Sequence, residues 1–216
     1  MGDAMNAVVH VIDDDASLRT ALSRLLMLSG YDVRQYAGAG DYLISTPDER
    51  PGCLLLDLHM PGGSGLALQD ALKWHPRYAK PVIFLTGHGD VPSSVRAIKS
   101  GACDFLTKPV DRTALLSAVA LALERDSAAR ARQERRIDVQ RHYAELSARE
   151  RVVLGGVIAG KLNKQIAHEL GVTERTVKGD RSRAFHLFGV RTLSELVPLI
   201  ADLELPLELQ PGHGHL

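Results

Sequence analysis

Short apolar runs alternate with helix-forming segments through the first 124 residues, and this alternation restricts the fold more than any other feature. Five runs have the length and composition of strands, namely residues 7–12, 32–36, 53–56, 81–86 and 103–107. The segments that follow them have helical spacing, namely Leu18 to Gly30, Ala39 to Ile44, Leu66 to His75 before Pro76, Pro92 to Ser100 before Gly101, and Leu115 to Leu123. Five strands alternating with five helices predict an α/β fold, a doubly wound five-stranded parallel sheet with helices on both faces.

Polar side chains stand where four of these five strands end. Residues 13–15, all aspartates, follow the first strand, Asp57 follows the third, Thr86 ends the fourth and Lys108 follows the fifth. Carboxyl ends of parallel strands share one edge of a sheet, so we expect these groups to lie together. Such carboxylates would repel one another without a cation, and their oxygens suit Mg²⁺. Singly, each residue could instead be a helix cap, a strand residue or a surface charge, but four matching strand ends seldom arise by chance.

The segments VIDDD, LLLDLHMPGGSG, LTGHGD and DFLTKP together resemble the receiver domain of two-component response regulators, and VRAIKSGACDFLTKP is similar to the FixJ subfamily. The resemblance covers nearly all of residues 7–124 and implies a flavodoxin-like receiver. It implies that Asp57 is the phosphoacceptor, which takes a phosphoryl group from a histidine kinase. It also implies that Asp14, Asp57 and the backbone carbonyl of His59 hold Mg²⁺ directly, and that Asp13 helps through water.

Four further residues have roles that this resemblance implies. Thr86 and Lys108 would contact the phosphoryl group, Phe105 would swing inward with Thr86 on phosphorylation, and the bond between Lys108 and Pro109 would be cis. In this family a face made of the fourth helix, fifth strand and fifth helix commonly dimerises. Here that face corresponds roughly to Pro92–Glu124.

The composition changes after the receiver-like part. Residues 125–141 are charged and hold few apolar positions, which predicts a solvated helical linker. Residues 142–204 contain four short helical segments with strong capping residues, and the turn Leu170-Gly171-Val172-Thr173 between two of them is typical of a helix-turn-helix. We therefore predict a receiver domain over 1–124, a linker over 125–141, a small all-α four-helix domain over 142–204 and a flexible tail over 205–216.

Residues 146–200 resemble the LuxR/NarL-type DNA-binding domain. The resemblance and the helix geometry place Arg175 and Lys178 toward the major groove and Asn163, Lys164 and Thr176 near phosphates. The DNA-binding set is completed by Arg181 and Ser182 on the same helix. Residues 141–200 carry ten basic and six acidic side chains, a net charge of +4, which is compatible with DNA but does not establish it.

Some positions depart from the family pattern. Val152, Leu162 and Asp180 stand where the family usually has Glu, Ser and His, and Gly179 lies inside the recognition helix. Because Asp180 is acidic, two questions stay open: whether the base contacts follow the family pattern, and whether the affinity for DNA is lower than in the family.

We expect a transcription regulator that is not an enzyme beyond its own phosphorylation and dephosphorylation. Its expected cofactor is Mg²⁺, and its expected partners are a histidine kinase, promoter DNA, a second copy of the chain on phosphorylation and, further, RNA polymerase. No apolar run reaches membrane-spanning length and no secretory signal stands at the start, so we expect a cytoplasmic protein without a membrane partner. Two alternatives stay open: a receiver with protein-only output, and a Mg²⁺-dependent phosphohydrolase, although such enzymes typically carry a second Asp where this chain has His59.

Overall fold

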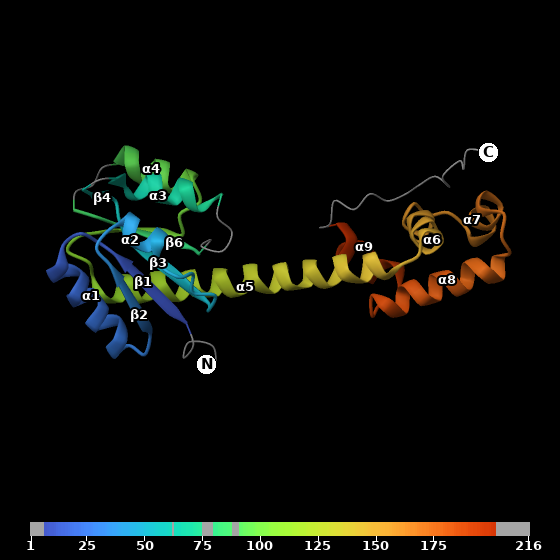
Figure 1. The fold of residues 1–216 in the computed structure, drawn as a ribbon, viewed down its shortest axis with the longest axis horizontal. Coiled ribbons are helices and arrows are strands. Elements are labelled where there is room, and N and C mark those ends of the chain that lie inside the picture. Colours follow the sequence, from blue (N-terminus) through green and yellow to red (C-terminus); the bar gives the residue numbers. More distant parts are fainter. Residues whose placement is uncertain (1–6, 62, 75–79, 88–90, 202–216) are drawn as a thin grey trace. The chain divides into compact units, whose positions relative to one another are not determined.

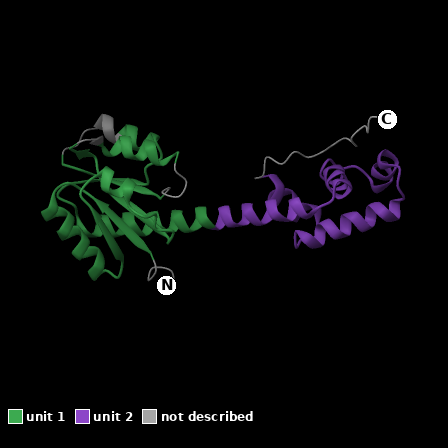
Figure 2. Ribbon diagram, in the orientation of Figure 1, with its two compact units in different colours: residues 1–130 green, residues 131–216 purple. Residues whose placement is uncertain are grey.

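The computed structural model describes residues 7–61, 63–74, 80–87 and 91–201, so the predicted tail 205–216 lies outside the described residues. The chain divides into two compact units, Met1–Arg130 and Ala131–Leu216 (Figure 2). Each unit is described separately below. None of the described helices is both long and apolar enough to cross a membrane.

Unit 1 is built on a parallel five-stranded sheet with the strand order β2-β1-β3-β6-β7. The strands are β1 Val8–Ile12, β2 Asp32–Tyr36, β3 Gly52–Asp57, β6 Val82–Thr86 and β7 Asp104–Thr107, and a separate hairpin pairs β4 His59–Met60 with β5 Gly63–Ser64. The central strands β1, β3 and β6 are buried along their whole length, which matches their nearly continuous apolar sequences. The predicted doubly wound parallel sheet is confirmed.

Helices cover both faces of this sheet (Figure 1). They are α1 Ala16–Leu28, α2 Ala39–Ile44, α3 Gly65–Leu72, α4 Val91–Lys99 and α5 Arg112–Glu145. Successive residues of β3 point to opposite faces. Leu55 therefore packs in the cluster that includes α1 and the first part of α5, whereas Leu54 and Leu56 pack in the cluster formed with α2, α3 and α4.

Two helices, α3 and α5, differ most from their predicted bounds. Helix α3 ends at Leu72 instead of His75, because Lys73 and Trp74 donate to carbonyls three residues earlier, which tightens the last turn; Pro76 lies outside the described residues. Helix α5 continues without a break through the predicted linker to Glu145. The linker is helical as expected, but the expectation of a solvated segment is wrong at Asp126 and Val139, which are both buried.

Unit 2 contains the end of α5 and four short helices, α6 Ala148–Ile158, α7 Asn163–Leu170, α8 Glu174–Leu187 and α9 Leu193–Ala201. Val139 and Tyr143 of α5 belong to its apolar core, together with residues of all four short helices. The predicted capping box of Ser147 and Glu150 begins α6, and Gly171 closes α7 with a φ of 64°. The predicted helix-turn-helix is thus α7, this turn and α8.

Candidate functional site: an acidic pocket and a helix-turn-helix

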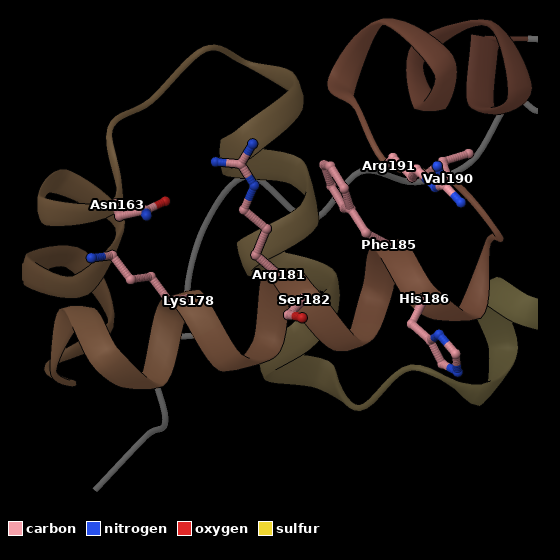
Figure 3. Close-up of a pocket in the computed structure, with 8 residues that line it drawn as sticks. All are labelled: Asn163, Lys178, Arg181, Ser182, Phe185, His186, Val190 and Arg191. Carbon is pink, nitrogen blue, oxygen red and sulfur yellow. The ribbon is translucent and has the colours of Figure 1, made fainter.

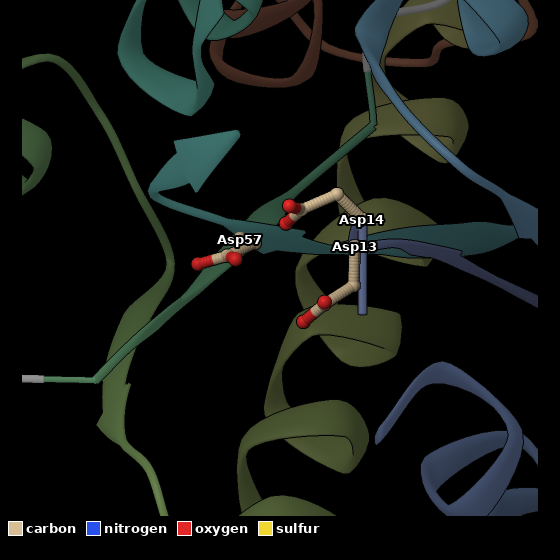
Figure 4. A group of neighbouring side chains, drawn as sticks. All are labelled: Asp13, Asp14 and Asp57. Atoms are coloured by element: carbon tan, nitrogen blue, oxygen red, sulfur yellow. The ribbon is translucent and has the colours of Figure 1, made fainter. Parts of the chain in front are cut away.

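Three of the predicted site residues meet at the carboxyl edge of the sheet. Asp13 and Asp14 follow β1 and Asp57 ends β3, and one carboxylate oxygen of each lies within 4.8 Å of the others (Figure 4). Asp13 and Asp57 are buried, whereas Asp14 is exposed. Parallel pairing of β1 with β3 brings residues 44 positions apart in sequence to the same edge, as the strand pattern predicted.

Lys108 binds two of these carboxylates. Its Nζ atom lies 2.8 Å from Oδ2 of Asp13 and 3.0 Å from Oδ2 of Asp57. Burial raises the pKa of Asp13, although hydrogen bonds from Lys108 and from the backbone N–H of Asp15 oppose that rise. Burial also lowers the pKa of Lys108, but its bonds to the two carboxylates outweigh this effect, and its pKa lies above the usual value. The lysine is therefore held as a cation between two acids.

Asp15 has a different role from its two neighbours. Its carboxylate accepts the backbone N–H groups of Ser17 at 2.8 Å and Leu18 at 3.1 Å, and so caps α1. Of the three consecutive aspartates, the capping explanation therefore applies to Asp15, while Asp13 and Asp14 face Asp57.

A pocket of about 430 Å³ opens beside Asp57 and is also lined by His59, Gly87 and Lys108. The backbone N–H of His59 donates to Oδ1 of Asp57 at 3.3 Å. Thr86 is fully buried next to this pocket and, among the described residues, is not part of its lining. Asp57 and Lys108 therefore line this pocket, whereas Thr86 lies behind its wall.

The other two switch residues also lie near this edge. The backbone N–H of Lys108 donates to the carbonyl of Thr86 at 2.6 Å, and the bond between Lys108 and Pro109 is cis. Phe105 is half-buried against the apolar cluster on the α3 and α4 face. Thr86 and Pro109 thus lie next to Lys108 at this edge, whereas Phe105 pairs with Phe84 two residues before the end of β7.

Gly65 is a site residue that the motif search passed over. A Cβ atom at this position would lie 2.4 Å from the carbonyl oxygen of Asp57 and 2.9 Å from the ring of Phe84. Its backbone N–H donates to the carbonyl of Leu58 at 3.0 Å. The glycine-rich turn therefore lets the chain return directly beneath Asp57, and the sequence GGSG after an apolar strand was the available signal.

The donor set fits a magnesium ion. The three clustered side chains offer only carboxylate oxygens, which are the ligands that Mg²⁺ prefers. Two of these acids are buried, and Lys108 is the cation paired with them among the described residues. Asp13, Asp14 and Asp57 can therefore hold a divalent cation that offsets their remaining negative charge.

Four of the seven predicted DNA-binding residues surround one hollow of unit 2. A pocket of about 550 Å³ is lined by Asn163, Lys178, Arg181, Ser182, Phe185, His186, Val190 and Arg191, and Lys178 points toward Asn163 (Figure 3). Of the other three, Lys164 and Arg175 are exposed, but the Thr176 hydroxyl lies 2.9 Å from the Thr173 hydroxyl at the start of α8.

His186 and Arg191 add two basic groups that the motif comparison missed. Lys178, Ser182 and His186 follow one another at intervals of four residues, so helical spacing alone could have placed His186 on this face. The Arg181 guanidinium lies 5.0 Å from the centre of the Phe185 ring, a cation–π contact that holds it along α8.

Asp180 does not lie on this face. It is 8% exposed, and its carboxylate receives two hydrogen bonds from Arg149 of α6, at 2.7 and 3.1 Å. The carboxylate thus pairs with α6, and a pattern of base contacts unlike the family's stays a prediction. Gly179 is exposed and has no neighbouring atom within 4 Å of a Cβ built on it.

Comparisons with known proteins agree with both halves of this geometry. The family model described as "Response regulator receiver domain" matches residues 9–120, and "Bacterial regulatory proteins, luxR family" matches residues 144–200. "Transcriptional regulatory protein FixJ" of Azorhizobium caulinodans is 41% identical over 189 residues, which are 88% of this chain and 89% of that protein. The chain belongs to the NarL/FixJ family of two-component response regulators.

Other members of the NarL/FixJ family are equally similar over nearly full length. "Response regulator protein TodT" of Pseudomonas putida is 39% identical over 94% of this chain and 88% of its own. The solved structure of the response regulator StyR is 40% identical, covers 91% of this chain and 99% of its own, and superposes with a TM-score of 0.77. These relatives are named as regulators and not as enzymes, in line with the expectation.

Membership of the NarL/FixJ family fixes the coarse function. The chain is a two-component response regulator that joins a receiver domain to a LuxR-type DNA-binding domain and regulates transcription. A receiver implies a kinase as partner, and the LuxR-type domain implies DNA.

Proposed function

We propose that phosphorylation of Asp57 by a histidine kinase controls the DNA binding of this regulator. The observation that carries the proposal is the pair of contacts from Lys108 to Asp13 and Asp57 at an open pocket. A carboxylate that is buried, oriented and open to a substrate on one side is suited to act as a nucleophile. The ammonium beside it can stabilise the charge of an arriving phosphoryl group.

In the proposed reaction, a carboxylate oxygen of Asp57 attacks the phosphorus of a kinase phosphohistidine. The new O–P bond forms as the N–P bond breaks, and the imidazole of the kinase leaves with the electron pair. Lys108 and the hydroxyl of Thr86 would contact the phosphoryl oxygens in the product. Asp14, Asp57 and the carbonyl of His59 directly, and Asp13 through water, would hold Mg²⁺, which supplies positive charge beside those oxygens when bound.

The phosphoryl group of the acyl phosphate carries about 1.5 to 2 negative charges at neutral pH. We propose that this charge shifts Thr86 and Phe105 and favours a dimer formed through α4, β7 and α5. Apolar side chains on this surface support the proposal, because Val95 and Ile98 of α4 are 47% and 50% exposed and Leu121 of α5 is 41% exposed.

Dimers would place two copies of α8 in successive turns of the major groove, where half-sites lie one helical turn apart. Arg175 and Lys178 would meet bases, and Asn163, Lys164 and Thr176 would meet phosphates, with Arg181 and Ser182 beside them. RNA polymerase is a further proposed partner. We further propose that the protein acts in the cytoplasm.

The phosphorylation step is tested with a small phosphodonor and Mg²⁺. Asp57→Asn should take up no phosphate and should remain monomeric by light scattering, whereas the wild type should dimerise. Asp15→Asn is the matched control, since it removes a neighbouring carboxylate and asparagine also caps helices well. If Asp57→Asn still dimerised on addition of the donor, Asp57 would be the wrong residue.

The DNA-binding step is tested by the salt dependence of binding to promoter fragments. Lys178→Ala should weaken binding and lower the slope of log K against log salt by about 1, because one phosphate or base contact of a cation is lost. Lys73→Ala removes the same charge from an exposed position of unit 1 and should change neither. Absence of any salt-sensitive binding, with or without phosphorylation, would favour protein-only output. Sustained turnover of an organic phosphate would favour the phosphohydrolase.

A further inference from the structure

The first turns of α5 beyond the predicted receiver domain are attached to unit 1. Asp126 is 3% exposed, although it lies in a segment whose sequence is highly charged. Its Oδ2 atom accepts the backbone N–H of Gly52 at 2.9 Å and the Nε–H of Arg130 at 2.7 Å. A buried carboxylate with two donors is stable where an unpaired one would be costly, so this position is a built contact.

Arg130 extends the same contact to the loop before β3. Besides Asp126, its guanidinium donates to the carbonyl oxygen of Glu49 at 2.6 Å and to that of Arg50 at 3.1 Å. Lys80 also donates to the carbonyl of Arg50, so that this carbonyl is held from two sides. The guanidinium thereby satisfies two backbone acceptors of this loop.

The contacts of Asp126 and Arg130 hold the strand that carries the proposed phosphoacceptor, Asp57. Gly52 begins β3, and Asp57 ends it. A Cβ atom at Gly52 would lie 2.2 Å from the carbonyl oxygen of Val8, so the first residue of β3 packs closely against β1. Asp126 and Arg130, four residues apart on one face of α5, therefore connect this helix to the amino end of β3.

We propose that Asp126 and Arg130, which we call the α5 latch, fix residues 125–130 to the receiver and make the free part of the linker begin after Arg130. The boundary between the two compact units falls at this residue. Resting on the proposed function, we extend this to signalling: the latch positions α5 so that phosphorylation of Asp57 changes DNA binding by unit 2. Both residues are positioning residues and neither touches the phosphoryl pocket.

Hydrogen exchange of the full-length chain tests the latch itself. Asp126→Ala should make the amide of Gly52 and the α5 amides of residues 125–130 exchange at least about tenfold faster, because the charge-assisted bonds of Asp126 are lost. Arg130→Ala should have the same effect on the α5 amides of residues 125–130, because its bonds to Asp126 and to the carbonyls of Glu49 and Arg50 are lost. Asp138→Ala and Arg132→Ala are matched controls on the same helix, since Asp138 is exposed and the side chain of Arg132 has no hydrogen bond or ion pair within the described part of the chain. They should leave these rates unchanged.

Equal exchange in latch and control variants would overturn the proposal. If Asp126→Ala does not fold, Arg130→Ala still tests the latch. The Arg130 side chain is 35% exposed, and its loss leaves the bond from Gly52 to Asp126 in place.

Promoter binding before and after treatment with phosphodonor and Mg²⁺ tests the coupling. Latch variants should take up phosphate at Asp57 as the wild type does, but should lose most of the phosphorylation-dependent gain in affinity. If both latch variants kept the full phosphorylation-dependent gain in DNA affinity, the proposed coupling between the latch and DNA binding would be overturned. If wild-type Asp57 took up no phosphate, the proposed function would fail while the exchange rates still decided whether the latch exists.

Discussion

Acid should weaken unit 1 through one buried histidine, His10 in the middle of β1. Its side chain is 1% exposed, its Nδ1 atom lies 3.2 Å from the hydroxyl of Tyr36, and its ring packs edge-on against Tyr42. Its Nε2 atom has no hydrogen-bond partner among the described residues. Burial, reinforced by the charge of Lys80 and opposed by that of Asp48, lowers the pKa of His10 from 6.5 to about 4.

The direction and size of the effect follow from linkage. Because the unfolded chain binds a proton near pH 6.5 and the folded chain only near pH 4, His10 favours the folded state fully above pH 6.5, and that contribution is lost as the pH falls toward 4. The lowered pKa corresponds to about 2 kcal/mol lost between pH 7.5 and pH 5, and to about 3 kcal/mol by pH 4.

Urea unfolding at pH 7.5 and pH 5 measures this loss, with hydrogen exchange of β1 and β3 peptides reporting on unit 1 separately. His10→Gln removes the titrating group, so the difference in unfolding free energy between wild type and variant should shrink by about 2 kcal/mol at pH 5. Comparing the two proteins cancels the titration of every other group. His168→Gln, at an exposed position of α7, is the matched control and should show no such change. A difference between wild type and His10→Gln that is the same at both pH values would refute the reasoning.

Three further substitutions test local structure. Leu162→Ser should stabilise unit 2 by about 1 kcal/mol and raise its Tm by calorimetry, because Leu162 stands at the N-cap of α7 without a side-chain hydrogen bond. Gly179→Ala should also stabilise α8, by up to about 1 kcal/mol in urea, since nothing lies within 4 Å of the added Cβ. Gly65→Ala should destabilise unit 1 by about 2 kcal/mol or more in the same assay, because its Cβ would meet the Asp57 carbonyl at 2.4 Å. Gain of stability in Gly65→Ala would contradict the close approach.

The strand ends were predictable from the sequence because their chemistry and their spacing carry independent information. Apolar runs gave the strands, and the parallel order brought Asp13, Asp57 and Lys108 to one edge. Hydrophobic periodicity, however, says little about where a helix ends. Helix α3 stops at Leu72, and its last carbonyls accept hydrogen bonds from the backbone N–H groups of Lys73 and Trp74. These bonds depend on local backbone geometry, which the pattern of apolar residues does not reveal.

Charged residues that become buried were not predictable in the same way. Asp126 and Asp180 stand in polar segments, and their sequence neighbours indicate solvated helix faces. Each is buried because a distant partner meets it, the N–H of Gly52 in one case and the guanidinium of Arg149 in the other. These partners lie 74 and 31 residues away in sequence, so only the tertiary structure brings them together.

The buried carboxylates differ in how their negative charge is balanced. This difference distinguishes carboxylates with a structural role from those suited to react. Asp126 and Asp180 each have an arginine of their own, and both of these contacts are closed by further hydrogen bonds. At the sheet edge, by contrast, Asp13 and Asp57 share Lys108 with a third acid close by, and the pocket beside them is open. A cluster that keeps excess negative charge beside an opening attracts a cation and positions a nucleophile, whereas a carboxylate paired one to one only holds two elements together. Under the proposed function, the same residue type thus serves signalling at β3 and attachment at α5 and α8.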